Sequence, residues 1–156
     1  MIVVADTSPL NYLILIHSID ILESLYERIV VPSAVRDELL HPSAPALVRA
    51  WAGDVPPWIE VREPSAVARS FPRGLGAGER EAIAFAHVHK ADLVLIDERL
   101  GRREAQLLGL QVIGTLGILQ EAHERGLLDI REAIRRLQGT TFQIAPSLLR
   151  SALGIT

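Results

Sequence analysis

The strongest constraint on the fold is a pair of short apolar runs, each of which stops at an aspartate. Residues 2–5 read Ile-Val-Val-Ala and are followed by Asp6, and residues 93–96 read Leu-Val-Leu-Ile and are followed by Asp97. Neither run alternates polar with apolar residues, as a strand with one face in water does, so both are expected to be strands buried on both faces. Such strands need a layer of structure on each side of their sheet.

Further short strands and helical segments alternate along the rest of the chain. Strands are expected at residues 29–31 and 112–113, and an edge strand is expected at 59–61. The expected helical segments are residues 9–17, 19–25, 32–40, 46–51, 79–88, 100–108, 115–125 and 129–137. Strands that alternate with helices indicate an α/β fold, with a mainly parallel central sheet and flanking helices.

The size of the chain fits one domain. Its 156 residues, 49% of them hydrophobic, are enough for a single core of ordinary size. We assign residues 1–125 to this core. Residues 126–156 are expected to form a helical C-terminal extension that packs on the core or on a partner.

Composition excludes several classes of function. The absence of cysteine excludes disulfides, thiolate zinc sites and cysteine nucleophiles, and it suits a cytoplasmic protein. A net charge of −3 excludes a globally basic protein that coats nucleic acid. Polar residues interrupt the apolar stretch at 10–25, so we expect no membrane span. Residues 1–6 also lack the basic region of a signal peptide.

Four acidic residues stand where the predicted elements can converge. Asp6 and Asp97 follow the two buried strands, and open α/β sheets bind ligands at the carboxyl ends of their strands. Glu38 lies in the helix after the second strand, and Glu79 opens a helix, where the helix dipole favours a carboxylate. If these helices flank one crevice, the carboxylates repel one another unless a cation binds. Mg²⁺ and Mn²⁺ prefer such oxygen ligands and can assist the hydrolysis of a phosphodiester.

Each of these acids also has a purely structural interpretation. Either strand-end aspartate can cap the helix that follows it, Glu38 can be a solvated charge on a helix face, and Glu79 can complement its helix dipole. Thr7 or Ser8 can likewise cap the helix that begins near Pro9. Residue spacing alone leaves both interpretations open.

Four segments resemble, in the same order, the motifs of PIN-domain nucleases. Residues 3–10 (VVADTSPL) resemble the opening motif, in which an aspartate ends the first strand and a hydroxyl residue follows. Residues 31–39 (VPSAVRDEL) resemble the second motif, with Glu38 in the metal-binding position. Residues 79–86 resemble the third motif, an acid that opens an alanine-rich helix, and residues 93–97 resemble the fourth, an acid after an apolar strand.

The resemblance extends over roughly the first 120 residues, within the usual size of one domain. Residues 97–103 and 114–119 most resemble a prokaryotic PIN-related branch close to VapC-type toxins. The resemblance implies a PIN-like α/β/α sandwich, RNA cleavage that depends on Mg²⁺ or Mn²⁺, and commonly a cognate antitoxin protein. The catalytic and metal-binding residues that it implies are Asp6, Glu38, Glu79 and Asp97.

The sequence departs from the family pattern in its third and fourth motifs. The third motif usually begins with aspartate, whereas Glu79 stands here, and Glu81, about 200° around the helix, is a rival for its role. Glu98 is a similar rival for Asp97. A hydroxyl residue often stands two positions before the fourth acid, where this chain has Leu95. These departures leave open a second function, in which a catalytically weakened PIN-like domain is a metal-binding or protein-binding interaction module.

Polar residues close to the acids suggest how a substrate is bound. Thr7 or Ser8 can orient a water molecule or a phosphate. Arg99, Arg102 and Arg103 can contact the phosphates of single-stranded or structured RNA. The arginines can equally form a solvated helix face that pairs with neighbouring acids.

The first helices carry more apolar residues than one helical face needs. This pattern suits a helix that the core covers on several sides. It also suits a homodimer interface, which is common in proteins that this sequence resembles. Tyr12, Trp51 and Trp58 are assigned to the core or to an interface, because so few aromatic residues leave base stacking sparse. The function that the resemblance to PIN nucleases implies is a Mg²⁺- or Mn²⁺-dependent endoribonuclease of the cytoplasm, the toxin of a toxin–antitoxin pair.

Overall fold

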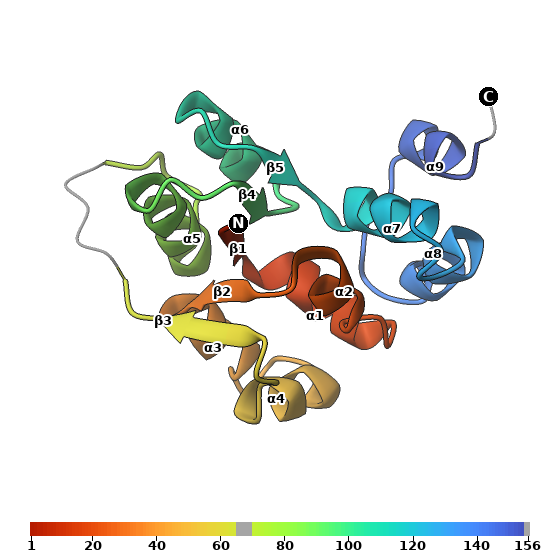
Figure 1. The fold of residues 1–156 in the computed structure, drawn as a ribbon, viewed down its shortest axis with the longest axis horizontal. Coiled ribbons are helices and arrows are strands. Elements are labelled where there is room, and N and C mark those ends of the chain that lie inside the picture. The colour runs from red at the N-terminus through yellow and green to blue at the C-terminus, as the bar shows by residue number, and fades with distance from the viewer. Residues whose placement is uncertain (65–69, 155–156) are drawn as a thin grey trace.

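A parallel sheet forms the centre of the protein (Figure 1). The computed structural model describes residues 1–64 and 70–154. The strands are β1 (Val3–Ala5), β2 (Ile29–Pro32), β3 (Ile59–Arg62), β4 (Leu93–Leu95) and β5 (Val112–Ile113). Their order in the sheet is β3-β2-β1-β4-β5, and each neighbouring pair is parallel. The fold is thus the predicted α/β sandwich, with β3 at an edge as expected.

Helices follow the strands along the chain. They are α1 (Thr7–Leu15), α2 (Ile21–Tyr26), α3 (Ser33–Leu39), α4 (Ala46–Gly53), α5 (Ala77–Val88), α6 (Arg99–Leu107), α7 (Thr115–Glu124), α8 (Ile130–Gln138) and α9 (Pro146–Ala152). The first helix begins at Thr7 and not near Pro9, which places Asp6 at its N-cap position. The Asp6 side chain makes no capping hydrogen bond there. Capping is therefore not what this acid does.

Both faces of the sheet are buried, as the apolar runs predict. Val3 and Ala5 of β1 belong to the larger core, which also holds the buried faces of α1, α7 and α8. Val4, between them, belongs to a smaller core with residues of α5 and α6. Side chains of β4 divide in the same way, with Leu95 in the larger core and Val94 in the smaller. A strand with both faces covered has no place for alternating polar residues.

The C-terminal extension shares the larger core. Its helix α8 buries Ile130, Ile134 and Leu137 there, and Phe142 packs against the same core. The expected core of residues 1–125 and extension of 126–156 each include positions outside the described residues, namely 65–69 and 155–156. Across residues 1–64 and 70–154, no helix has the length and apolar character needed to cross a membrane.

The strand order creates a crevice at the carboxyl end of the sheet. From β1 the chain adds β2 and β3 on one side, and β4 and β5 then join on the other side of β1. Such a switch in the direction of strand addition is where open α/β sheets bind ligands. Because Ala5 of β1 pairs with Leu95 of β4, the two strands end side by side and deliver Asp6 and Asp97 to this crevice.

Candidate active site

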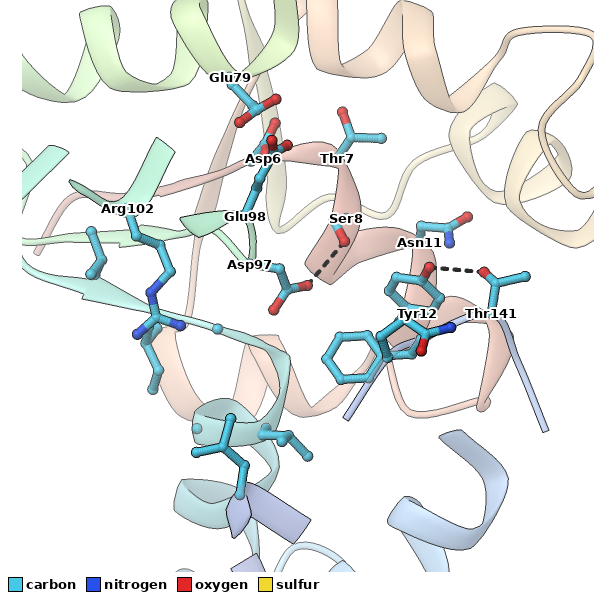
Figure 2. A pocket seen from close by; sticks show the side chains of 18 of the residues that line it. Asp6, Thr7, Ser8, Asn11, Tyr12, Glu79, Asp97, Glu98, Arg102 and Thr141 are labelled. Carbon is cyan, nitrogen blue, oxygen red and sulfur yellow. Dashed lines mark hydrogen bonds between the residues drawn. The ribbon is translucent and has the colours of Figure 1, made fainter. Parts of the chain in front are cut away.

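A cavity of about 820 Å³ opens at the carboxyl edge of the sheet. The predicted site residues that line it are Asp6, Thr7, Ser8, Glu38, Glu79, Asp97, Glu98 and Arg102. Figure 2 shows Asp6 and Glu79 close together at one end of the cavity, with Ser8 and Asp97 below them. Glu81, Arg99 and Arg103 do not contribute to its lining. The structure thus brings all four predicted acids, and one of the two rivals, to one cavity.

Asp6 is the most buried of the acids that line the cavity, with 4% of its surface exposed. Its backbone N–H donates a hydrogen bond of 2.9 Å to the carbonyl oxygen of Leu95, which ties it to the end of β4. Its Oδ1 atom is buried and has no hydrogen-bond donor among the described residues. Burial and, to a smaller extent, the negative charge of nearby carboxylates raise the pKa of Asp6 to about 7. One carboxylate oxygen of Asp6, the buried Oδ1, therefore lacks the partner that a structural aspartate has.

Glu38 is held in place by α1 and α5. The Thr7 hydroxyl donates a hydrogen bond to its Oε2, and the Gly78 backbone N–H donates one of 2.9 Å to its Oε1. Residue 78 has to be glycine for this contact, because a Cβ there would lie 2.8 Å from each carboxylate oxygen of Glu38. Although Glu38 is exposed, these two hydrogen bonds hold its carboxylate at the cavity, so it is not the freely solvated charge of the structural alternative.

A pair of carboxylates links α3 and α5 in both directions. Glu38 on α3 accepts from Gly78 near the start of α5, and Glu81 on α5 accepts a hydrogen bond of 3.2 Å from the N–H of Ala34 near the start of α3. Each carboxylate satisfies a backbone N–H that the first turn of a helix leaves unpaired. Glu81 thus has a structural partner away from the cavity, whereas Glu79 lines the cavity.

Glu79 combines a local role with a place in the site. Its Oε1 accepts a hydrogen bond of 3.2 Å from the Gly76 N–H at the start of α5, which is the helix-end role that its position predicts. Its Oε2 is buried without a donor among the described residues. A Cβ at Gly101 would lie 2.9 Å from this oxygen, so glycine leaves room for it. Burial, and then the charges of Glu98 and Glu38, raise the pKa of Glu79 to about 7.

Asp97 is held by donors from α1 and α7. The Thr115 N–H donates to its Oδ1 and the Thr115 hydroxyl to its Oδ2, both at 2.7 Å, and the Ser8 hydroxyl also donates to Oδ2 at 3.0 Å. Ser8, like Thr7, therefore uses its hydroxyl to hold an acid of the site and does not cap α1. Thr115 is not among the site residues predicted from the sequence. The available signal was a hydroxyl residue that opens a helix directly after a short strand.

Arg102 is the predicted arginine that reaches the cavity. Arg102 lies on α6 and is half-buried. Its Nη1 atom and the Oδ1 atom of Asp97 both flank Gly114, because a Cβ at Gly114 would lie 2.9 Å from each of them. Its guanidinium forms no ion pair within the described part of the chain. Arg102 therefore brings positive charge to an acidic cavity without being neutralised by one of its acids.

Comparison with known proteins identifies the family. Residues 2–155 match the model of the family DUF3368, a PIN domain. The chain belongs to this PIN-domain family. PIN domains are generally nucleases, so the predicted resemblance to PIN nucleases is confirmed, whereas the closeness to VapC-type toxins stays a prediction.

The fold comparison agrees with the family. This PIN domain is similar to a solved structure of a PilT N-terminus domain protein from the hyperthermophilic archaeon Sulfolobus solfataricus P2. The TM-score is 0.53 and the sequence identity 18%, with 93% of this chain and 100% of the other chain covered. At this identity the likeness supports the shared fold. No curated protein shows significant sequence similarity to the chain.

The acids of the PIN domain fit a divalent cation. Asp6 Oδ1 and Glu79 Oε2 are buried carboxylate oxygens that lack donors in the described structure, and buried charge is costly unless it is paired. Carboxylate oxygens are the ligands that Mg²⁺ and Mn²⁺ prefer. Within residues 1–64 and 70–154, no three Asp, Glu or His side chains are already arranged around a common ion position. Binding would therefore draw the carboxylates closer together.

Neutral residues that were not predicted as part of a site also line the cavity. They are Asn11, Tyr12, Gln120, Phe142 and Gln143. Tyr12, which was assigned to the core or an interface, packs edge to face against Phe142 with ring centroids 4.9 Å apart. The Tyr12 and Thr141 hydroxyl oxygens, 2.9 Å apart, share a hydrogen bond (Figure 2). These residues come from distant segments of the chain, so no local pattern could have joined them.

Proposed function

We propose that this PIN domain is a metal-dependent endoribonuclease. The observation that carries the proposal is a pair of buried carboxylate oxygens, Asp6 Oδ1 and Glu79 Oε2, without donors among the described residues and at a cavity that Arg102 also lines. Bound Mg²⁺ or Mn²⁺ would neutralise these acids, activate water and stabilise charge on a phosphodiester. The choice of RNA over DNA comes from the motifs that resemble PIN nucleases.

The acids of the site take different parts in holding the cation. Asp6 and Glu79 would bind it directly, because one buried oxygen of each has no donor in the described structure. The side chain that lies beside Glu79 is another acid, Glu98. Glu38 and Asp97 already accept hydrogen bonds from the protein, so they would complete the ligand set directly or through water. Glu98, which also lines the cavity, stays a rival to Asp97.

The remaining polar residues orient the acids and the substrate. Thr7 and Ser8 hold Glu38 and Asp97 through their hydroxyls, and a hydroxyl oxygen that donates can still accept a hydrogen bond from water. Arg102 would contact a phosphate oxygen next to the scissile bond, since its guanidinium forms no ion pair in the described chain. An acidic cavity then attracts RNA only through the cation and local arginine.

The test is cleavage of single-stranded and structured RNAs in Mg²⁺, Mn²⁺ or EDTA. We expect wild type to cut in either metal and not in EDTA, and Asp6→Asn and Glu38→Gln to abolish cutting while the fold survives. Asp37→Asn is the matched control, because Asp37 is exposed and does not line the cavity. Folded wild type that neither cuts RNA nor binds Mn²⁺ in calorimetry would disprove the proposal. Mn²⁺ binding without cleavage would favour the second candidate, an interaction module whose third motif begins with Glu79.

We further propose that the protein is the toxin of a toxin–antitoxin pair and acts in the cytoplasm as a homodimer. The support is the resemblance of residues 97–103 and 114–119 to the branch close to VapC-type toxins, together with the absence of cysteine. Induced expression should arrest growth, and co-expression of a small protein encoded next to it should relieve the arrest. Asp6→Asn should be harmless. Growth that the wild-type protein leaves unchanged would contradict the toxin role, and a monomer in light scattering would contradict the homodimer.

A further inference from the structure

The cavity has two chemically different ends. Arg102 lies on one side of the acids, and Asn11, Tyr12 and Thr141 lie on the other side, here called the amide end (Figure 2). The side-chain amides of Asn11, Gln120 and Gln143 line the same cavity. None of these amides makes a hydrogen bond within the described residues. Each amide offers a carbonyl acceptor and two N–H donors. An uncharged, unpartnered set of donors and acceptors suits a neutral ligand with mixed hydrogen-bonding edges.

Aromatic and apolar side chains shape the amide end. Tyr12 is half-buried, and the Phe142 ring and the Thr141 hydroxyl both restrain it. Ile113 and Leu116 add apolar surface to the same cavity. A flat, partly apolar ligand would therefore contact ring surface while its edge meets the amides. The rings are fixed before a ligand arrives, which lowers the entropic cost of binding.

The helix α1 connects the two ends of the cavity. Ser8, which donates to Asp97, lies three residues before Asn11 and four before Tyr12, so the three side chains share one face of the helix (Figure 2). One turn of helix advances about 5.4 Å. Asn11 and Tyr12 therefore lie about one helical turn from Ser8, the residue that contacts Asp97. The cavity, about 820 Å³ in volume, is within the range of roughly 300–1,000 Å³ that small-molecule sites occupy.

We propose that the amide end is a nucleobase subsite, which holds the base of the nucleotide next to the scissile phosphate. This inference rests on the proposed ribonuclease function. Bases of single-stranded RNA are recognised by stacking on aromatic rings and by hydrogen bonds to their edges. Asn and Gln amides match base edges because they donate and accept side by side. The amide end thereby gives an enzyme with few arginines at its site a preference for certain bases.

The first test measures binding without metal, phosphate or cleavage. Side-chain NH₂ signals of ¹⁵N-labelled protein are followed by NMR during titration with adenosine, guanosine, cytidine or uridine, and with ribose as the control. Asn11 is the single asparagine of the chain, so its signal is the one that an Asn11→Ser variant lacks. We expect nucleosides to shift the signals of Asn11, Gln120 and Gln143, and ribose to leave them in place. Unshifted signals at saturating nucleoside, or equal shifts with ribose, would overturn the proposal.

The second test measures cleavage specificity. Gln143 is exposed and not part of the core, so Gln143→Ala should fold normally. We expect Gln143→Ala to lose roughly tenfold of the discrimination between bases beside the cut, mainly as a higher KM for the preferred site. Gln138→Ala is the control, because Gln138 is exposed and outside the cavity lining. An unchanged base preference in Gln143→Ala would overturn the subsite. Wild type that cuts nothing would instead refute the ribonuclease function, and the nucleoside titration would still decide the subsite.

Discussion

At the level of single residues, the acids of the site differ in how well the protein pairs them. Asp97 accepts three hydrogen bonds from Ser8 and Thr115, whereas Asp6 and Glu79 each keep a buried oxygen without a donor in the described structure. A protein selected for stability alone would have no reason to keep these two carboxylates. Unpaired buried acids of this kind are typical of functional sites, where stability is sacrificed for activity.

Asp6→Asn should stabilise the metal-free protein at alkaline pH. The pKa of Asp6 rises from 3.8 to about 7 on folding, mainly through burial, so the folded state binds the proton more tightly than the unfolded state does. The contribution of Asp6 to wild-type stability is therefore largest below about pH 4, and it is lost as the pH rises through 7. Asparagine carries no such proton. The stability difference between variant and wild type should grow by about 2–3 kcal/mol between pH 5 and pH 8.

The measurement is urea unfolding of both proteins in EDTA at pH 5 and pH 8. Asp37→Asn, on the exposed side of α3, is the control. A metal-free Asp6→Asn protein that is less stable than wild type at pH 8 would mean that ionised Asp6 has a stabilising partner in the fold.

Thr115→Val should weaken both the fold and catalysis. Valine has the shape of threonine but no hydroxyl, so the variant removes one of the two Thr115 donors to Asp97 at a position with no exposed surface. Loss of a hydrogen bond to a charged group costs about 1.5–3 kcal/mol. We expect a loss of this size in chemical denaturation and a lower kcat with little change in KM. Thr115→Ser keeps the donor and should restore kcat; equal activity in all three proteins would show that this bond does not position Asp97 for catalysis.

At the level of elements, the sequence predicted what local pattern determines. Buried strands such as β1 and β4 have no polar alternation, and the acids at their ends point to the carboxyl edge of the sheet. Where α1 begins was missed, because Thr7 and Ser8 resemble capping residues yet bond to acids distant in sequence. The role of Thr115 and the amide end of the cavity were missed for the same reason, since only long-range packing brings these segments together.

Gly78→Ala should reverse the usual effect of this substitution in a helix. Alanine normally stabilises a helix by about 1 kcal/mol relative to glycine. At Gly78, however, the added Cβ would lie 2.8 Å from the Glu38 carboxylate and would displace it from the Gly78 N–H. We expect lower thermal stability and a loss of RNA cleavage. Gly53→Ala on α4 meets no atom within 4 Å and is the matched control, with stability unchanged or raised. A Gly78→Ala protein with wild-type activity would refute the placement of Glu38.

Substitutions of Glu81 should separate its structural role from metal binding. Glu81→Gln keeps an acceptor for the Ala34 N–H, so Mn²⁺ affinity and cleavage should remain close to those of wild type. Glu81→Ala removes the acceptor and should cost about 1 kcal/mol, as loss of a helix N-cap does. Calorimetry with Mn²⁺ and thermal unfolding check both variants. A Glu81→Gln protein that no longer binds Mn²⁺ would instead make Glu81 the metal ligand of the third motif.

At the level of the whole molecule, the small negative net charge conceals a local concentration of acids. The chain carries a net charge of −3, yet Asp6, Glu38, Glu79, Asp97 and Glu98 all line one cavity. Repulsion within this cavity opposes folding, and in the proposed function it would also oppose RNA binding until a cation enters. Metal binding, stability and substrate binding would then be linked through the same few side chains.

This linkage predicts that Mn²⁺ stabilises the folded protein, and more so at pH 8 than at pH 6. Asp6 and Glu79, with pKa values raised to about 7, must lose their protons before they bind the cation, so protons compete with metal at the lower pH. A ligand present at a hundred times its dissociation constant adds about 2.7 kcal/mol to the free energy of unfolding. Thermal unfolding with increasing Mn²⁺, against NaCl of equal ionic strength, measures the effect. Asp6→Asn should lose most of this stabilisation by Mn²⁺. A wild-type unfolding temperature that millimolar Mn²⁺ leaves unchanged at pH 8 would show that this carboxylate cluster is not a cation site.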